Sequence, residues 1–129
     1  MKKILVVDDD VYQGILYEQE LEDMGYQVLT SDTGKQAIRV CLEEKPDLVI
    51  IDLVLPDIHG LNVIARILEK NPKIPVIINS AYPHYRNNFK SWAADKYILK
   101  SADLSELKKA INEILAGENK AKNGVGSRV

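Results

Sequence analysis

The chain reads Ile4-Leu5-Val6-Val7-Asp8-Asp9-Asp10 near its beginning, four apolar residues followed at once by three acids. A second apolar run, Leu48-Val49-Ile50-Ile51, is followed by Asp52. Apolar runs of this length between polar residues are typical of strands buried on both faces of a parallel sheet. Residues after such strands lie at their carboxyl ends, where open α/β sheets form binding sites. The two runs therefore predict a parallel sheet with acids at its functional edge.

Strand-like runs alternate with segments of helical period along the whole chain. Three further strands are predicted, at 26–30, from 75 to 78 and at 96–99. The first helix is expected to end at Gly25 and to bury one apolar stripe, made of Val11, Ile15, Leu16, Leu21 and Met24. The interval 82–94 is less regular and is expected to hold a short helix. The alternation predicts an α/β fold, a doubly wound five-stranded parallel sheet flanked by five helices.

Length and composition are those of one folded domain, with 129 residues, 46% hydrophobic and 28% charged. The net charge is −2 and charges of both signs are interspersed, which argues against nucleic acid or an anionic membrane as the partner. The single cysteine, Cys41, cannot form an internal disulfide, and a cytoplasmic location is expected. Gly117 is expected to end the last helix, so that 1–117 form the domain and 118–129 a flexible tail.

Polar side chains follow four of the predicted strands and are expected to meet at one edge of the sheet. They are Asp8 and Asp9 after the first strand, Asp52 after the third, Ser80 after the fourth and Lys100 after the fifth. The three carboxylates would repel one another in a partly desolvated crevice, and a hard divalent cation such as Mg²⁺ would relieve the repulsion. A carboxylate can attack phosphorus when positive charge neutralises the phosphoryl oxygens, and a hydroxyl can donate a hydrogen bond to one of them. The pattern therefore predicts phosphate chemistry with Asp52 as nucleophile, assisted by Lys100 and Ser80.

Over residues 2–117 the chain resembles the receiver domain of two-component response regulators, the group that includes the chemotaxis receiver. The motifs that carry the resemblance stand in the family's order: Ile4-Leu5-Val6-Val7-Asp8-Asp9, Asp52 with Pro56 and Gly60, Ser80-Ala81, and Tyr97 with Lys100. The resemblance implies a flavodoxin-like fold with strand order 2-1-3-4-5. It also implies that Asp52 accepts a phosphoryl group from the phosphohistidine of a histidine kinase.

The resemblance further implies a cation site and a set of partners. Asp9, Asp52 and the backbone carbonyl of Val54 would ligate Mg²⁺ or Mn²⁺, with Asp8 contributing largely through water. The implied partners are a sensor histidine kinase or a phosphotransfer protein, and a downstream protein target. The chain would be a monomer or a phosphorylation-dependent dimer.

A conformational switch is implied as well. Lys100 would pair with the phosphoryl group, Ser80 would move to bond it, and Tyr97 would then turn inward. Family members usually have proline after this lysine, commonly with a cis bond, whereas this chain has Ser101. A trans bond is expected here, because a cis bond before a residue other than proline costs about 2.5–4 kcal/mol. The span from Ala81 to Lys100 is also slightly shorter than usual, so its helix is expected to be short or irregular.

Three other functions fit parts of the pattern. A Mg²⁺-dependent phosphohydrolase would need a general acid near Asp52 and a cap over its substrate, but Val54 supplies no acid and no insertion is long enough for a cap. A module that retains only the fold would leave the acids, Ser80 and Lys100 unexplained, and nucleotide binding would need a Gly-rich loop after the first strand. No DNA-binding or enzymatic segment follows Gly117 in this sequence. If this is the whole natural chain, we expect non-enzymatic signalling through protein contacts or onward phosphate transfer.

The remaining candidate residues have simpler interpretations. Asp10 is expected to be a solvated acid in the first helical turn, Cys41 a core residue, and His59 and His84 surface residues. Four aromatic residues recur at helical spacing, Tyr82, Tyr85, Phe89 and Trp92. They form either the core side of a short helix or an exposed face for a partner, and the sequence leaves both open.

Overall fold

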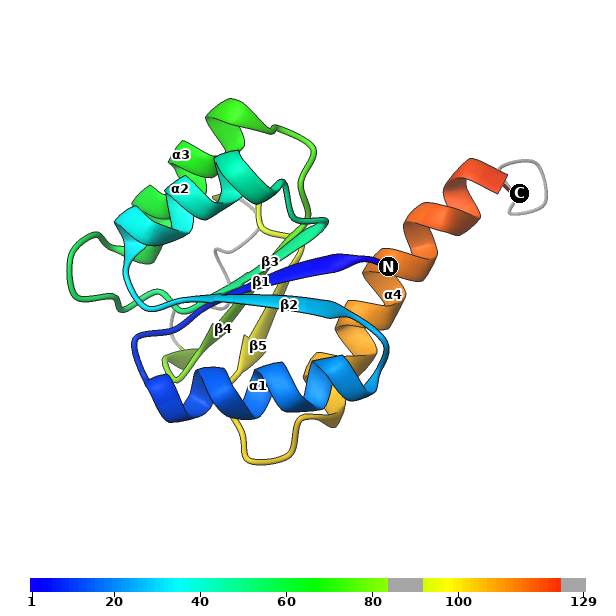
Figure 1. The fold of residues 1–129 in the computed structure, drawn as a ribbon, viewed down its shortest axis with the longest axis horizontal. Helices are drawn as coiled ribbons and strands as arrows, with labels where there is room; N and C mark the ends of the chain where they lie inside the picture. The colour runs from blue at the N-terminus through cyan, green and yellow to red at the C-terminus, as the bar shows by residue number, and fades with distance from the viewer. Residues whose placement is uncertain (84–91, 124–129) are drawn as a thin grey trace.

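The structure, a computed structural model, describes residues 1–83 and 92–123, with side chains as far as 116. Within these ranges the chain forms five strands and four helices (Figure 1). In chain order they are β1 (Lys3–Val7), α1 (Val11–Asp23), β2 (Gln27–Ser31), α2 (Gly34–Glu44), β3 (Leu48–Ile51), α3 (Gly60–Lys70), β4 (Val76–Ser80), β5 (Lys96–Leu99) and α4 (Ser105–Asn123). The fifth predicted helix, in 82–94, falls largely outside the described residues, as do His84, Tyr85 and Phe89.

All five strands are parallel and lie in the order β2-β1-β3-β4-β5, which confirms the predicted doubly wound sheet. Helices α2 and α3 cover one face of the sheet, and α1 and α4 cover the other (Figure 1). The chain passes from β2 on one side of β1 to β3 on its other side. In sheets of this kind that reversal opens a crevice at the carboxyl ends of the two strands.

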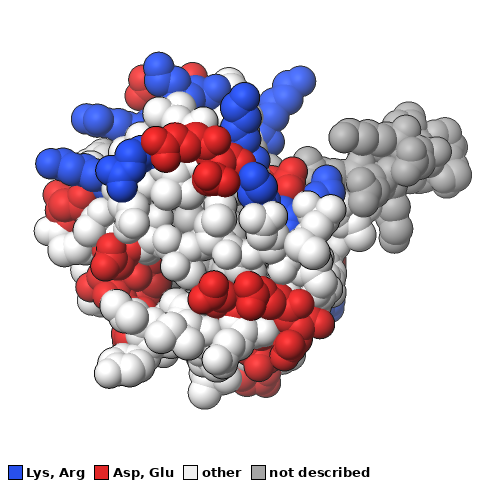
Figure 2. Space-filling model, viewed as in Figure 1, with Lys and Arg blue, Asp and Glu red and all other residues white. Residues whose placement is uncertain are grey.

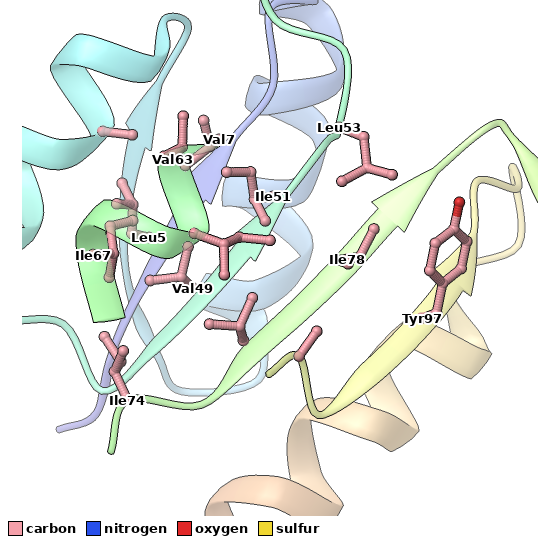
Figure 3. Packing of buried hydrophobic residues seen from close by; sticks show 14 residues of the cluster. Leu5, Val7, Val49, Ile51, Leu53, Val63, Ile67, Ile74, Ile78 and Tyr97 are labelled. Carbon is pink, nitrogen blue, oxygen red and sulfur yellow. The ribbon is translucent and has the colours of Figure 1, made fainter. Parts of the chain in front are cut away.

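Two hydrophobic cores lie on the two faces of the sheet, because successive strand residues point to opposite sides. Leu5 and Val7 of β1 pack beneath α2 and α3, whereas Ile4 and Val6 pack beneath α1 and α4. Figure 3 shows the first of these cores, which also contains Val49, Ile51, Leu53, Val63, Ile67, Ile74, Ile78 and Tyr97. Burial on both faces explains why the central strands are continuous apolar runs in the sequence.

The ends of the helices are set by polar side chains and one glycine. Asp10 Oδ1 accepts hydrogen bonds from the backbone N–H groups of Tyr12 and Gln13, at 3.0 and 3.3 Å, so Asp10 is the N-cap of α1. His59 is exposed, as predicted, but its Nδ1 also caps α3 by accepting from the N–H of Leu61 at 3.1 Å. Gly25, with a φ of 96°, follows the last turn of α1 and confirms the predicted end.

The predicted apolar stripe of α1 is wrong at three of its five positions. Three of its residues are exposed, namely Val11, Ile15 and Leu16. Leu21 is buried and Met24 packs against the core, as predicted, and the other buried positions are Gly14 and Tyr17. Tyr17 can be buried because Asn79 Nδ2 donates a hydrogen bond to its hydroxyl at 2.9 Å. This polar contact selects a face of α1 that apolar residue types alone do not indicate.

The predicted end of the last helix at Gly117 is also wrong. The backbone of α4 continues as helix through Gly117 to Asn123. A glycine inside a helix costs only about 1 kcal/mol relative to alanine, and its neighbours Ala116 and Glu118 are strong helix formers. The domain boundary at 117 therefore stays a prediction. None of the described helices, α4 included, is long and apolar enough to cross a lipid bilayer.

Two glycines provide a matched test of close packing. A methyl group on Gly60 would lie 2.6 Å from the carbonyl oxygen of Asp52 and 2.6 Å from Leu53 Cα, whereas one on Gly14 would meet only a methyl of Thr30 at 4.0 Å. We expect Gly60→Ala to lower the free energy of unfolding by about 1–3 kcal/mol, because backbone must shift. Gly14→Ala, in a helix interior, is expected to be neutral or stabilising by up to about 1 kcal/mol. Urea unfolding of both variants measures the difference, and equal stabilities would contradict it.

Candidate functional site

Three carboxylates meet at the carboxyl edge of the sheet, as predicted. Asp8, Asp9 and Asp52 each offer one oxygen, and these atoms all lie within 4.8 Å of one another. Asp8 and Asp52 are 5% and 7% exposed, whereas Asp9 faces solvent. Hydrogen bonds that continue the sheet hold the two buried residues side by side. The N–H of Asp8 donates to the carbonyl of Ser31, and the N–H of Asp52 donates to that of Val7, both at 3.0 Å.

The Lys100 side chain points into this acidic group, which confirms its predicted place. Its Nζ lies 2.6 Å from Asp52 Oδ2 and 2.9 Å from Asp8 Oδ2. Partial burial would by itself lower the pKa of the Lys100 ammonium, but the hydrogen bonds to Asp52 and Asp8 outweigh it and raise the pKa above its ordinary value. The described backbone contains no cis peptide bond, so the bond between Lys100 and Ser101 is trans, as expected.

The other predicted site residues lie around the same edge. Ser80 is fully buried at the end of β4, and its Oγ accepts a hydrogen bond from the N–H of Tyr82 at 3.2 Å. The N–H of Val54 donates to Asp52 Oδ1 at 3.2 Å, and the Val54 side chain is exposed. Tyr97 is buried, and its hydroxyl donates to the carbonyl of Tyr82. The movements of Ser80 and Tyr97, and the Val54 carbonyl as a ligand, stay predictions.

The sequence reading missed a polar pair beneath the acids. Tyr17 and Asn79 are 1% and 4% exposed and hydrogen-bond to each other. Burial raises the pKa of the Tyr17 hydroxyl, which is also close enough to be influenced by Lys100, Asp8 and Asp52. One signal was available: Asn79 is an amide in an otherwise apolar strand, and such a side chain needs a partner.

The donor set fits a hard divalent cation. Three carboxylates supply oxygen ligands only, the type that Mg²⁺ prefers. Figure 2 shows that the side chains over α1 on this face are acidic or uncharged, whereas Lys and Arg gather over α2 and α3. Helix α1 has no basic residue and carries Glu18, Glu20, Glu22 and Asp23. The negative potential on this side of the sheet also favours a cation. Positive charge from a cation and from Lys100 can together hold an anionic group against Asp52.

The comparisons with known proteins agree with this geometry. The family model described as "Response regulator receiver domain" matches residues 4–112. Protein PilH of Pseudomonas aeruginosa is 32% identical over 91% of this chain and 100% of its own length. The chain spans only 26% to 52% of four other curated relatives described as transcriptional regulators or regulatory proteins.

Two solved structures of the response regulator TrrA from Thermotoga maritima are similar in fold and sequence. TrrA in complex with Mg²⁺-BeF is 39% identical, with a TM-score of 0.83 over 88% of this chain and 99% of TrrA. A structure of the histidine kinase ThkA in complex with TrrA matches at 40% identity, with a TM-score of 0.82 over 89% of this chain and 99% of the matched chain. On the family match and the shared fold, the chain belongs to the response regulator receiver domain family.

Proposed function

We propose that the chain is a signalling switch that accepts a phosphoryl group on Asp52. The observation that carries the proposal is the position of Lys100, whose ammonium bridges Asp52 and Asp8 at 2.6 and 2.9 Å inside a group of three carboxylates. A structural ion pair needs one carboxylate for each ammonium. The additional acids are accounted for if a cation joins them and a phosphoryl group then occupies the space beside Lys100.

The chemistry follows from the side chains present. An oxygen of Asp52 forms a bond to phosphorus while the bond between phosphorus and the donor's histidine nitrogen breaks, and the nitrogen keeps the electron pair. Lys100 balances the negative charge that arrives with the phosphoryl oxygens. Mg²⁺, held by Asp8, Asp9, Asp52 and the Val54 carbonyl, would supply further positive charge.

A histidine kinase or a phosphotransfer protein is the proposed donor. TrrA, which is 39–40% identical to this chain, has been solved both with a histidine kinase and with Mg²⁺-BeF, and this supports the donor and the cation. Output is proposed to pass through Ser80 and Tyr97. Phosphorylation adds about −1.5 to −2 charges and new acceptor oxygens. Movement of Ser80 toward these oxygens would change the packing around Tyr82 and Tyr97. In this structure the Tyr97 hydroxyl donates a hydrogen bond to the Tyr82 carbonyl.

The phosphorylation site can be tested by intact-mass measurement with acetyl phosphate as donor. We expect one phosphoryl group per wild-type chain when Mg²⁺ is present, and none in excess chelator or in Asp52→Asn. Asp10→Asn is the matched control, because Asp10 is a helix cap outside the acidic group and asparagine caps equally well. Labelling of Asp52→Asn to the wild-type level would refute the assignment.

The lifetime of the phosphoryl group is expected to be long. Hydrolysis needs a water in line with phosphorus. The resemblance to receivers implies that the residues two beyond the nucleophile and two beyond the switch hydroxyl flank this water, and here they are Val54 and Tyr82, both exposed. Valine cannot bind a water and tyrosine is bulky, so Val54→Asn should hasten decay several-fold, whereas Val54→Ala should change it little. Decay after donor removal, followed by mass, measures both. If Val54→Ala accelerates decay as much as Val54→Asn, crowding rather than water binding sets the lifetime.

The switch can be tested by amide hydrogen exchange with beryllofluoride as the phosphoryl mimic. We expect changed protection in 82–92 and 97–107 of the wild type, because Tyr82 is hydrogen-bonded to both Ser80 and Tyr97. In Ser80→Ala the mimic should still bind, but the changes in amide protection in 82–92 and 97–107 should be smaller. The variant lacks the hydroxyl that would move toward the phosphoryl oxygens. Changes confined to 8–10 and 52 in the wild type would refute the proposed output route.

A further inference from the structure

The hydrogen bond between Tyr17 and Asn79 lies directly beneath the acidic group. Tyr17 comes from α1 and Asn79 from the end of β4, and the Asn79 Nδ2 donates to the tyrosine oxygen at 2.9 Å. Both side chains are buried, so water does not compete for either group. The contact joins α1 to the strand that carries Ser80.

Asn79 is also the neighbour of Asp52 across the sheet. Ile51 of β3 pairs with Ile78 of β4, so the residues that follow them stand side by side. Ile50 and Ile77 both lie in the core beneath α1 and α4, and alternation along the strands directs Asp52 and Asn79 to that same face. Adjacent strands are about 4.8 Å apart, which brings the amide of Asn79 within reach of the Asp52 carboxylate.

The Asp52 carboxylate is a competing acceptor for this amide. Its Oδ1 accepts from the Val54 N–H at 3.2 Å and its Oδ2 from Lys100 at 2.6 Å, and each carboxylate oxygen has a second lone pair. A charged acceptor forms a hydrogen bond roughly twice as strong as a neutral one. The amide donates to the Tyr17 hydroxyl, and no hydrogen bond from it to Asp52 is formed among the described residues, so the contact with Tyr17 orients the amide.

We propose that Tyr17 is a positioning residue that holds the amide of Asn79 away from Asp52. With the tyrosine oxygen absent, the buried amide has to find another acceptor, and Asp52 is the adjacent one. A hydrogen bond from Asn79 would occupy a lone pair that Asp52 needs for phosphorus or for the cation. The inference rests on the proposed phosphorylation of Asp52 and concerns a pair of residues that binds neither the phosphoryl group nor the cation.

The test combines Tyr17→Phe and Asn79→Leu, singly and together. Two quantities are measured for each variant. One is the rate of phosphoryl uptake from acetyl phosphate at saturating Mg²⁺, and the other is the Mg²⁺ dissociation constant, obtained by calorimetry. We expect Tyr17→Phe to slow uptake several-fold and to weaken Mg²⁺ binding. The double variant is expected to recover both, because it removes the competing donor and replaces both polar partners by apolar ones. Asn79→Leu alone should stay near the wild-type rate.

Leu21→Val is the control for stability, because Leu21 lies on the same buried face of α1 as Tyr17. It should lower the melting temperature without changing uptake or Mg²⁺ affinity. The side-chain amide resonance of Asn79 gives a readout independent of activity. It should shift when Asp52→Asn is added to the Tyr17→Phe background, and should not shift when Asp52→Asn is added to the wild type.

The outcomes separate this inference from the proposed function. If the wild type takes up no phosphoryl group, the proposed function fails. If the wild type is labelled but Tyr17→Phe is labelled equally fast, or the double variant stays as slow as Tyr17→Phe, the positioning role is overturned. Slow uptake by Asn79→Leu alone would overturn it too, and this outcome can be tested even if Tyr17→Phe does not fold.

Discussion

The site depends on one electrostatic constraint: two buried carboxylates stand side by side, and the ammonium of Lys100 compensates them. Asp8 and Asp52 are brought together by the sheet hydrogen bonds that continue past β1 and β3, and Lys100 reaches both at less than 3 Å. Charges buried in this way are unfavourable unless they are paired. The hydrogen bonds from both acids raise the pKa of Lys100, so it stays charged at physiological pH. A third carboxylate, Asp9, leaves the group with excess negative charge that a divalent cation is suited to balance.

The backbone around Asp52 leaves little room for that residue to move. The N–H of Gly60 donates to the Leu53 carbonyl at 2.7 Å, and a methyl group at Gly60 would collide with the backbone of Asp52 and Leu53. On the other side, Asn79 stands in the neighbouring strand and is held by Tyr17. Asp52 is therefore positioned by the loop that contains Gly60 and by the sheet. Such support from several elements is what a reacting group needs to keep one geometry.

Most of the site was predictable because it consists of residues at the ends of apolar runs. Asp8, Asp9, Asp52 and Lys100 follow strands that the sequence marks clearly, and Ser80 is the last residue of another. Parallel strands bring their carboxyl ends to one edge. The pairing of Lys100 with Asp8 and Asp52 then follows from opposite charge at short range. The errors were made in helices instead. The buried face of α1 includes Tyr17, and burial of its hydroxyl requires a hydrogen-bond partner, which lies 62 positions away in the sequence. Periodicity within a helix carries no information about such a contact.

The sequence by itself determined the fold class, the parallel sheet and the set of charged residues at its edge, since strand burial and strand ends are local properties of the residue pattern. Only the tertiary structure decided which face of α1 is buried, that α4 continues through Gly117, and that His59 and Asp10 cap helices. It also showed that Tyr17 and Asn79 form a buried hydrogen-bonded pair. The physical reason is the same in each case. A side chain with two acceptable environments takes the one in which its polar atoms find partners, and the partners are known only once the chain has folded.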